Sequence, residues 1–299
     1  MYYAEFNDLR QFGIEIEVYG VLKPTIARAL NQKGIRAEVT PYTHRVYPQW
    51  RVSTDSSIKG RNSAEIVSPI LTGQAGLDQV ATVLDVLRKE GCKVNDSTGI
   101  HIHWNCQDYT GKNLLSLLRL YSKFERVIDY LVPENRRGNL NRHCRSMVKD
   151  NNLDWIAELD TTERARAAEV VVEFNSKHTT VYVDPRTQEQ EVRSSRYHKV
   201  NVTSYASFGT IEFRHYHSVL DPDQVLPWIV FTQQLVNKAR EVSIAKQVSA
   251  KPTLGEMLRV LKLVDHFFIE NQCIDLRILD LPIWLKERYT GFREGMIRE

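Results

Sequence analysis

The chain has 299 residues, of which 42% are hydrophobic and 26% are charged, a composition typical of globular proteins and not of disordered or fibrous ones. The net charge of +3 is too small to favour a surface built for nucleic acid or for a membrane. Length alone allows one large or two ordinary domains. Because no repeat, low-complexity tract or Gly/Ser linker interrupts the sequence, we predict a single domain over 1–299, with a core at about 12–236 and a helical C-terminal region at about 221–299.

Cysteine spacing and the N-terminal sequence indicate a cellular compartment. The cysteines are widely scattered and form no CxxC pair, which favours reduced thiols over disulfides or a zinc site; they are Cys92, Cys106, Cys144 and Cys273. The first residues, MYYAEFNDLRQFG, carry acids where a signal peptide would carry basic and apolar segments. No apolar run approaches the roughly 20 residues of a membrane span. We expect a soluble, cytoplasmic protein that does not bind membranes.

The first half of the chain is predicted to mix strands and helices. Residues 11–19 alternate between apolar and polar types, as a strand does. Apolar residues recur at helical spacing over 74–90, where Gly91 supplies a stop, and over 112–131. Further elements are expected as follows: a helix over 22–33, β-rich pieces within 35–70 (YPQWRVSTD and SAEIVSPIL), and a strand, IHIHWN, over 100–105.

The second half begins with an Arg-rich loop from Pro133 to about Arg145. A helix is predicted over 161–175, and HTTVYVD, YHKVNVTSY and GTIEFRHYH follow as three strands. Helices are predicted over 223–245 and 253–270, while the last thirty residues match neither pattern. Several successive strands lack an intervening helix. The predicted fold class is therefore α+β, with a mostly antiparallel sheet.

Three predicted strands each carry two polar side chains that are two residues apart. The pairs are Glu15 with Glu17, His101 with His103, and Glu212 with Arg214. Residues at i and i+2 of a strand point to the same face, about 6–7 Å apart. The alternate positions are apolar in every pair. One such pair is typical of a solvated strand face, but three with the same apolar alternation favour one sheet with a polar, chemically active face.

A face of this kind requires a counter-charge, because neighbouring carboxylates repel one another. Asp55 and Glu65 flank further β-like pieces and are candidates for the same group. Carboxylates with an occasional imidazole suit Mg²⁺ or Mn²⁺. An arginine beside them matches phosphate oxygens. The combination fits phosphoryl transfer, in which catalysis is mainly positioning and charge neutralisation.

Four segments of the sequence now permit a comparison with a known family. In order they are FGIEIEVYG, WRVSTDSSIKGRNSAEIVSPIL, NDSTGIHIHWN and GTIEFRHYHSVLD, and together they resemble the amidoligases. That family belongs to the glutamine synthetase-like superfamily, with glutamate–cysteine ligase and the guanidino kinases as more distant relatives. The resemblance runs from about Phe12 to about Val236. It implies a curved, mostly antiparallel sheet with helices on its convex face.

The resemblance also implies roles for individual residues. Glu15, Glu17, Glu65, His101 and Glu212 resemble the metal ligands of the family. His103 resembles a histidine near the nucleotide phosphates, and Arg214 resembles the arginine that stabilises the transferring phosphoryl group. The implied cofactors are ATP and Mg²⁺, with Mn²⁺ as a substitute.

Other residues match the family pattern less directly. Asp55 lies in STDSSI, where relatives carry Asp or Glu at shifted spacing, and it is a candidate catalytic base. Asn201 is a candidate for positioning substrate. The segment RRGNLNRHCR resembles a family segment that is expected to contact phosphate or substrate, although a solvated loop explains it equally well. In that comparison Arg137 and Arg142 are expected to contact the nucleotide. Arg136 and Arg145 are expected to contact substrate. His215 and His217 are expected on the side opposite Glu212, and they are left out of the site.

The resemblance implies an ATP- and Mg²⁺-dependent ligase that joins a carboxylate to an amine through an acyl-phosphate. The expected partners are small-molecule or peptide carboxylates and amines, whereas a nucleic acid acceptor and the oligomeric state stay open. Three alternatives also stay open. They are a phosphotransferase like the guanidino kinases, a metal-dependent hydrolase, and a binding module with a degenerate site.

Overall fold

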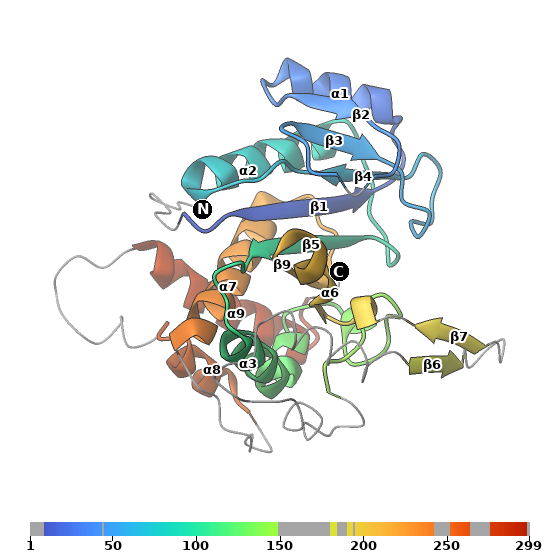
Figure 1. The fold of residues 1–299 in the computed structure, drawn as a ribbon. Helices are drawn as coiled ribbons and strands as arrows, with labels where there is room; N and C mark the ends of the chain where they lie inside the picture. The colour runs from blue at the N-terminus through green and yellow to red at the C-terminus, as the bar shows by residue number, and fades with distance from the viewer. Residues whose placement is uncertain are drawn as a thin grey trace. The chain divides into compact units, whose positions relative to one another are not determined.

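A computed structural model describes residues 9–43, 45–148, 180–183, 190–193, 195–241, 252–263 and 276–297 (Figure 1). The chain divides into two compact units, each assembled from three segments. Unit 1 comprises Met1–Trp104, His215–Thr232 and Ile269–Trp284, and unit 2 comprises Asn105–Arg214, Gln233–Phe268 and Leu285–Glu299. The single catalytic domain expected from the sequence stays a prediction.

The described strands form one seven-stranded sheet in the order β2-β3-β4-β1-β5-β9-β8 and a separate hairpin of β6 and β7. The strands are β1 (Phe12–Val18), β2 (Ala37–Val39), β3 (Trp50–Ser53), β4 (Ala64–Val67), β5 (Gly99–Asn105), β6 (Thr180–Val183), β7 (Gln190–Arg193), β8 (Val200–Asn201) and β9 (Thr210–His217). In the described chain β2 pairs with β3 in parallel, whereas the pairs β1–β4, β1–β5, β3–β4, β6–β7 and β8–β9 are antiparallel. The predicted α+β class with a mostly antiparallel sheet is confirmed.

In unit 1, β1 pairs with β4 on one side and with β5 on the other, antiparallel in both cases. Ile14 lies opposite Ile102, and Ile16 lies opposite both Ile66 and Ile100. Because directly opposed residues point to the same face, these isoleucines form one apolar face of the sheet. The alternate positions of the same strands form the other face.

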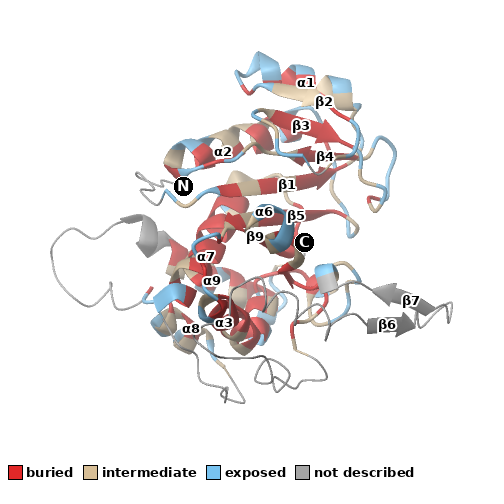
Figure 2. Cartoon of the chain, viewed as in Figure 1, coloured by how far each residue is buried: buried red, intermediate tan, exposed pale blue. Residues whose placement is uncertain are grey.

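Two helices of unit 1 are α1 (Lys23–Gln32) and α2 (Gly73–Lys89). The fully buried residues of α2 recur at helical spacing and are Leu77, Val80, Val83, Leu84 and Leu87. Each such side chain contributes about 1.5–3 kcal/mol on burial. The helix approaches β1 closely, since a Cβ on Gly76 would lie 3.1 Å from the Phe12 ring. Figure 2 shows β3 and β4 buried almost throughout, whereas α1 carries exposed residues.

Unit 2 contains α3 (Gly111–Asp129), whose first turn is closed by a capping box between Thr110 and Asn113. Its apolar stripe includes Tyr121, which packs on Phe213 of β9 with ring centroids 6.0 Å apart. The remaining helical elements of the described residues are η1 (Glu134–Arg136), η2 (Ser195–Tyr197), α6 (Thr203–Phe208), α7 (Pro222–Glu241), α8 (Leu254–Val260) and α9 (Leu276–Arg293). The last part of α7 and the last part of α9 belong to unit 2.

Most predicted elements of the described chain are confirmed, and two are wrong in part. The helix predicted over 253–270 ends at Val260, because Lys262 adopts a left-handed backbone conformation (φ 55°) that an α-helix does not continue through. The strand predicted over YHKVNVTSY ends at Asn201 and is followed by α6. The reason is local: the Asn201 side-chain oxygen accepts hydrogen bonds from the Thr203 amide (2.8 Å) and hydroxyl (2.7 Å), which turns the chain out of the strand. The helix predicted over 161–175 lies outside the described residues. The sequence did not predict β7, and it left the segment of α9 unassigned.

Two expectations about the whole chain can be compared with the described residues. Cys92, Cys106 and Cys144 are buried and form no disulfide within the described residues, and Cys273 lies outside this part of the chain. Burial raises the pKa of the Cys92 thiol to about 12. None of the helices in the described ranges combines the length and the apolar character that crossing a bilayer requires.

Candidate metal and active site

The polar face of the unit 1 sheet is assembled by strand register. Glu15 lies opposite His101 of β5, and Glu17 lies opposite Glu65 of β4. His103 is opposite Gly13, which has no side chain. The i, i+2 pairs predicted from the sequence therefore share one face, as expected. We call Glu15, Glu17, Glu65, His101 and His103 the acidic face.

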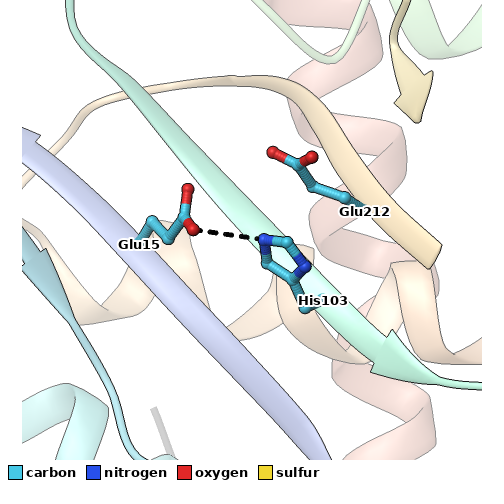
Figure 3. A group of neighbouring side chains, drawn as sticks. All are labelled: Glu15, His103 and Glu212. Carbon is cyan, nitrogen blue, oxygen red and sulfur yellow. Dashed lines mark ion pairs between the residues drawn. The ribbon is translucent and has the colours of Figure 1, made fainter. Parts of the chain in front are cut away.

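The two histidines of the acidic face converge on Glu15. His101 Nδ1 lies 2.9 Å from Glu15 Oε2, and His103 Nε2 lies 3.3 Å from Glu15 Oε1. Figure 3 draws the Glu15–His103 ion pair as a dashed line. His101 Nε2 also lies 3.8 Å from Glu17 Oε1. The His101 imidazole thus lies between the two carboxylates of β1, while His103 pairs with Glu15.

The orientation of Glu17 is fixed by backbone groups. The Gly99 amide donates to Glu17 Oε2 at 2.6 Å, at the start of β5. The hydroxyl of Ser218, just after β9, lies 2.8 Å from the carbonyl oxygens of both Glu17 and Gly99. Glu17 is only 4% exposed. Because one carboxylate oxygen is held by Gly99, the other oxygen has a defined direction.

Glu65 and Asp55 extend the acidic face towards β3. Ligand atoms of Glu15, Glu65 and His101 lie within 4.8 Å of one another, and those of Glu17, Asp55 and Glu65 form a second such group. Glu65 is common to both. Asp55 is half-buried, and its Oδ1 accepts the Ser57 amide at 2.6 Å. The structure thus brings together six of the residues selected from the sequence, which are Glu15, Glu17, Asp55, Glu65, His101 and His103.

The electrostatics of these carboxylates differ. Burial raises the pKa of Glu65 well above 4.5, the charges of Glu15, Glu17 and Asp55 add to this increase, and the guanidinium of Arg51 partly opposes it. Burial also acts to raise the pKa of Glu15. Hydrogen bonds to His101 and His103 and their charge outweigh that effect and hold the pKa well below 4.5. One carboxylate is therefore stabilised as the anion, while its buried neighbour resists ionisation.

A divalent cation fits this donor set. Carboxylates and an imidazole are hard ligands of the kind that Mg²⁺ and Mn²⁺ accept, and no thiolate takes part. A cation near Glu65 would oppose the charge repulsion that raises its pKa. The buried carboxylates of the acidic face therefore suit a bound divalent ion better than they suit an empty sheet face.

In unit 2, several of the predicted residues are arranged around Glu212. Its carboxylate accepts a hydrogen bond from the Asn201 amide at 2.5 Å and pairs with Arg214 Nη1. Arg214 Nε donates to the backbone carbonyl of His143 at 3.2 Å, on the Arg-rich loop. Asn201 and Glu212 are also directly opposed in the β8–β9 pair. The structure therefore brings together the candidate metal ligand, the candidate substrate residue and the candidate phosphoryl-stabilising arginine.

The four arginines of the Arg-rich loop lie in different environments. Arg136 is buried and donates to Cys144 Sγ at 3.7 Å, and Arg145 is also buried. The Arg137 guanidinium lies over the rings of Tyr130 (5.0 Å) and Phe292 (5.3 Å). Arg142 is exposed. Only Arg142 matches the solvated-loop alternative, while Arg137 takes part in packing.

The residues excluded from the site are buried in unit 1. His215 lies edge-on to Trp228 at 6.2 Å, and His217 lies 4.6 Å from the ring of Tyr216. Trp104 and Trp228 of the same unit are fully buried core side chains.

Sequence reasoning missed three contributors to the acidic face, which are Arg51, Gly99 and Ser218. Arg51 alternates with the buried Trp50 and Val52, so its place on the polar face was readable from the strand pattern. Gly99 acts through its amide, and Ser218 follows the end of a strand. No residue-type signal marks either of those two.

A family model described as "Putative amidoligase enzyme" matches residues 8–236. The match covers most of the chain, and the chain belongs to this family. A search of curated proteins found no match.

The chain is also similar to a solved structure titled "Crystal structure of novel glutamine synthase homolog". The two share 11% sequence identity with a TM-score of 0.41. The similarity covers 96% of this chain, which spans 66% of the length of the other chain.

Proposed function

We propose that the protein is an ATP- and Mg²⁺-dependent ligase that joins a carboxylate to an amine through an acyl-phosphate. The observation that carries this proposal is the acidic face, where carboxylates and an imidazole from β1, β4 and β5, together with Asp55 beyond β3, form two groups whose ligand atoms lie within 4.8 Å of one another. Membership of the amidoligase family supports amide formation as the outcome. The substrates are a small-molecule or peptide carboxylate and an amine, and the proposed location is the cytoplasm.

The residues that would hold divalent ions are Glu15, Glu65 and His101 in one group and Glu17 with Glu65 in the other. The ions would neutralise charge on the nucleotide phosphates. His103, which is paired with Glu15, would keep a positive charge near those phosphates. The hydrogen bonds from His101 and Gly99 orient Glu15 and Glu17 before any substrate is bound.

The proposed reaction has two steps. The substrate carboxylate attacks the γ-phosphorus of ATP, the bond to the ADP oxygen breaks, and an acyl-phosphate forms. The amine nitrogen then attacks the acyl carbon, phosphate leaves, and the nitrogen loses a proton. Asp55, which is half-buried and in the second carboxylate group, is the candidate acceptor for that proton. No covalent bond to the protein is required.

Glu212, Asn201 and the arginines are assigned to the same reaction through the family resemblance. Glu212 would act as a further metal ligand, and Arg214 would stabilise the transferring phosphoryl group. The pairing of Arg214 with Glu212 and with the His143 carbonyl supports a fixed guanidinium, since a preorganised group costs no reorganisation during the reaction. Asn201, Arg136 and Arg145 would position substrate, while Arg137 and Arg142 would contact the nucleotide.

The test is a screen of paired carboxylates and amines for ADP release with Mg²⁺ and ATP. A ligase releases ADP only when both partners are present, and its product has lost one water relative to the two partners. A product that has instead gained a phosphoryl group would identify a phosphotransferase. Turnover without nucleotide would identify a hydrolase.

Site variants make the assignment specific. Glu17→Gln keeps the shape of the side chain and the acceptor for the Gly99 amide while it removes the charge, and it should lower kcat at least about 100-fold. Arg88→Gln is a matched control because Arg88 lies on the exposed surface of α2. If Glu17→Gln keeps wild-type activity, the acidic face is not the active site.

A further inference from the structure

Unit 2 contains a second group of buried charges, which the proposed reaction does not use. Lys199 is fully buried, and its ammonium lies 2.7 Å from Glu125 Oε1 and 2.5 Å from Asp129 Oδ1. The two carboxylates are four residues apart on α3, so they project from one side of the helix. We call Lys199, Glu125 and Asp129 the lysine cluster.

The second oxygen of each carboxylate accepts a backbone amide from the same loop. Glu125 Oε2 accepts the Met147 amide at 2.7 Å, and Asp129 Oδ2 accepts the Gly138 amide at 3.0 Å. These two amides lie near the two ends of residues 136–147. We call this segment the arginine loop because it contains the four arginines of the Arg-rich loop described above, Arg136, Arg137, Arg142 and Arg145. Helix α3 thus holds both ends of the arginine loop.

Backbone hydrogen bonds of Lys199 connect the arginine loop to β9. The Lys199 amide donates to the Arg145 carbonyl at 2.9 Å, and its carbonyl accepts the Arg214 amide at 2.8 Å. The Arg145 amide donates to the Tyr197 carbonyl at 2.8 Å. Lys199 is therefore bonded to α3 through its side chain, and to the arginine loop and β9 through its backbone.

We propose that Glu125, Asp129 and Lys199 are positioning residues that hold the arginine loop in place for substrate and phosphate recognition. This inference rests on the proposed function. The cluster acts through the loop: the loop carries the buried Arg136 and Arg145, and its His143 carbonyl accepts Nε of Arg214.

The chemistry of the cluster favours positioning over simple stabilisation. Replacing a buried ion pair by apolar residues of similar volume is often neutral or stabilising, so charge is not required for a stable core. An apolar cluster would, however, offer no acceptor to the Gly138 and Met147 amides. The two carboxylates supply those acceptors, and Lys199 makes it possible to bury them as anions.

Two triple variants separate the acceptors from the charges. Lys199→Met with Glu125→Gln and Asp129→Asn removes every charge but leaves an amide oxygen for each loop amide. Lys199→Met with Glu125→Leu and Asp129→Leu removes charges and acceptors together. Lys123→Met, on the same helix but at the partly exposed pair with Glu256, is the control.

The first readout is residue-resolved hydrogen exchange, which does not depend on activity. The leucine variant should exchange the Gly138 and Met147 amides about tenfold faster than wild type, the equivalent of one lost hydrogen bond to a charged group. The amide-bearing variant and Lys123→Met should stay within about threefold of wild type. Equal protection in both triple variants would overturn the proposal. The wild-type protein gives a further test that does not require any variant to fold. The proposal is also overturned if its Gly138 and Met147 amides exchange as fast as the amide of the exposed Arg142.

The second readout is steady-state kinetics of the proposed ligase reaction. The leucine variant should raise KM about tenfold while kcat changes less than about threefold, and the amide-bearing variant should restore KM. A purely structural role would lower the active fraction and therefore kcat in both variants, with KM unchanged. If wild-type protein shows no ligase activity, the proposed function fails, while the exchange experiment still decides whether the lysine cluster holds the loop.

Discussion

The acidic face of unit 1 and the lysine cluster of unit 2 are two ways of burying carboxylates in one chain. In the lysine cluster, one ammonium lies within 2.7 Å of both carboxylates, and each second oxygen accepts a backbone amide. The acidic face has no lysine in its described ion pairs. Arg51 is the cation that acts on Glu65, and its Nη1 donates to the Thr43 carbonyl at 3.1 Å.

The difference shows in the protonation of the two groups. Burial acts to lower the pKa of Lys199, but the charges of Glu125 and Asp129 outweigh it and raise that pKa above 10.5. The lysine cluster is therefore balanced by the protein itself. On the acidic face the pKa of Glu65 is raised, because burial and three neighbouring carboxylates disfavour its charge. The carboxylates of the acidic face therefore need bound protons or a bound cation to offset their charge. This need distinguishes the acidic face, as a candidate binding site, from the lysine cluster, whose charges are offset within the protein.

The largest expected effect is a loss of stability when the lysine cluster loses its cation. Lys199→Met leaves two carboxylates buried without their cation and should lower the free energy of unfolding by about 3–5 kcal/mol. Urea unfolding in EDTA measures it. Arg88→Met, which removes the exposed pair with Asp85, is the control and should cost less than about 1 kcal/mol. A loss for Lys199→Met as small as that of the control would mean that the cluster is not balanced as described.

The second-largest expected effect is the stabilisation of the acidic face by a divalent ion. Mg²⁺ or Mn²⁺ at about 100 times its dissociation constant should stabilise the protein by about 2.7 kcal/mol, because the ion binds only the folded chain. Thermal unfolding with the ion and with EDTA measures this difference. Glu65→Gln removes the carboxylate common to both ligand groups and should abolish most of it. An equal response to the ion in wild type and Glu65→Gln would exclude the acidic face as the binding site.

These two clusters also differ in how far the sequence predicted them. The acidic face was predictable because strand alternation converts an i, i+2 spacing into a shared face, and Ile14 and Ile16 between the carboxylates mark that alternation. The order of the strands was not predictable from alternation. Only the register shows that Glu17 lies opposite Glu65 and that Glu15 lies opposite His101.

The lysine cluster left almost no signal in the sequence. Glu125 and Asp129 lie on one helix, but Lys199 is some 70 positions away and comes beside them only through folding. A buried Glu125 next to the apolar Phe124 and Ile128 was the only local sign. The end of β8 was missed for a similar reason, since the Asn201 side chain turns the chain where β-branched residues favour a strand.

The third prediction uses the protonation of the acidic face in metal-free protein. A carboxyl with a raised pKa in the folded state binds its proton more readily there than in the unfolded chain. The stability that Glu65 contributes is therefore complete below pH 4.5 and is lost as the pH rises through its raised pKa. Glu15 has a lowered pKa, so its contribution is present above pH 4.5 and changes only below it.

Of these two carboxyls, Glu65 is therefore the one that makes the free energy of unfolding depend on pH above pH 4.5. Unfolding in EDTA should show stability falling with pH by up to about 1.4 kcal/mol per pH unit, the limit for one proton. Glu65→Gln should flatten this slope. Adding Mg²⁺ should reverse it, because a higher pH favours the ionised ligand. A slope that Glu65→Gln leaves intact would have to come from another group.

The smallest effect concerns Ser218, which contacts the acidic face only through the backbone. Its hydroxyl lies 2.8 Å from the carbonyl oxygens of Glu17 and Gly99, so Ser218→Ala should cost about 1 kcal/mol of stability. The same contact aligns the Gly99 amide that holds Glu17 Oε2 at 2.6 Å. Mg²⁺ affinity should consequently fall by less than about tenfold, because Ser218 helps to orient a metal ligand but does not itself bind the ion.

A matched change on the apolar face shows whether this loss of affinity is specific. Thr232→Val keeps the shape of a buried side chain and removes the acceptor 2.9 Å from Trp104 Nε1, so its cost should also be about 1 kcal/mol. Trp104 points to the side of Ile100 and Ile102, away from the carboxylates, and Mg²⁺ affinity should be unchanged. Equal stability loss with unequal affinity would show that Ser218 acts on the ligand geometry. Equal loss of affinity in both variants would instead mean that the acidic face responds to any weakening of β5.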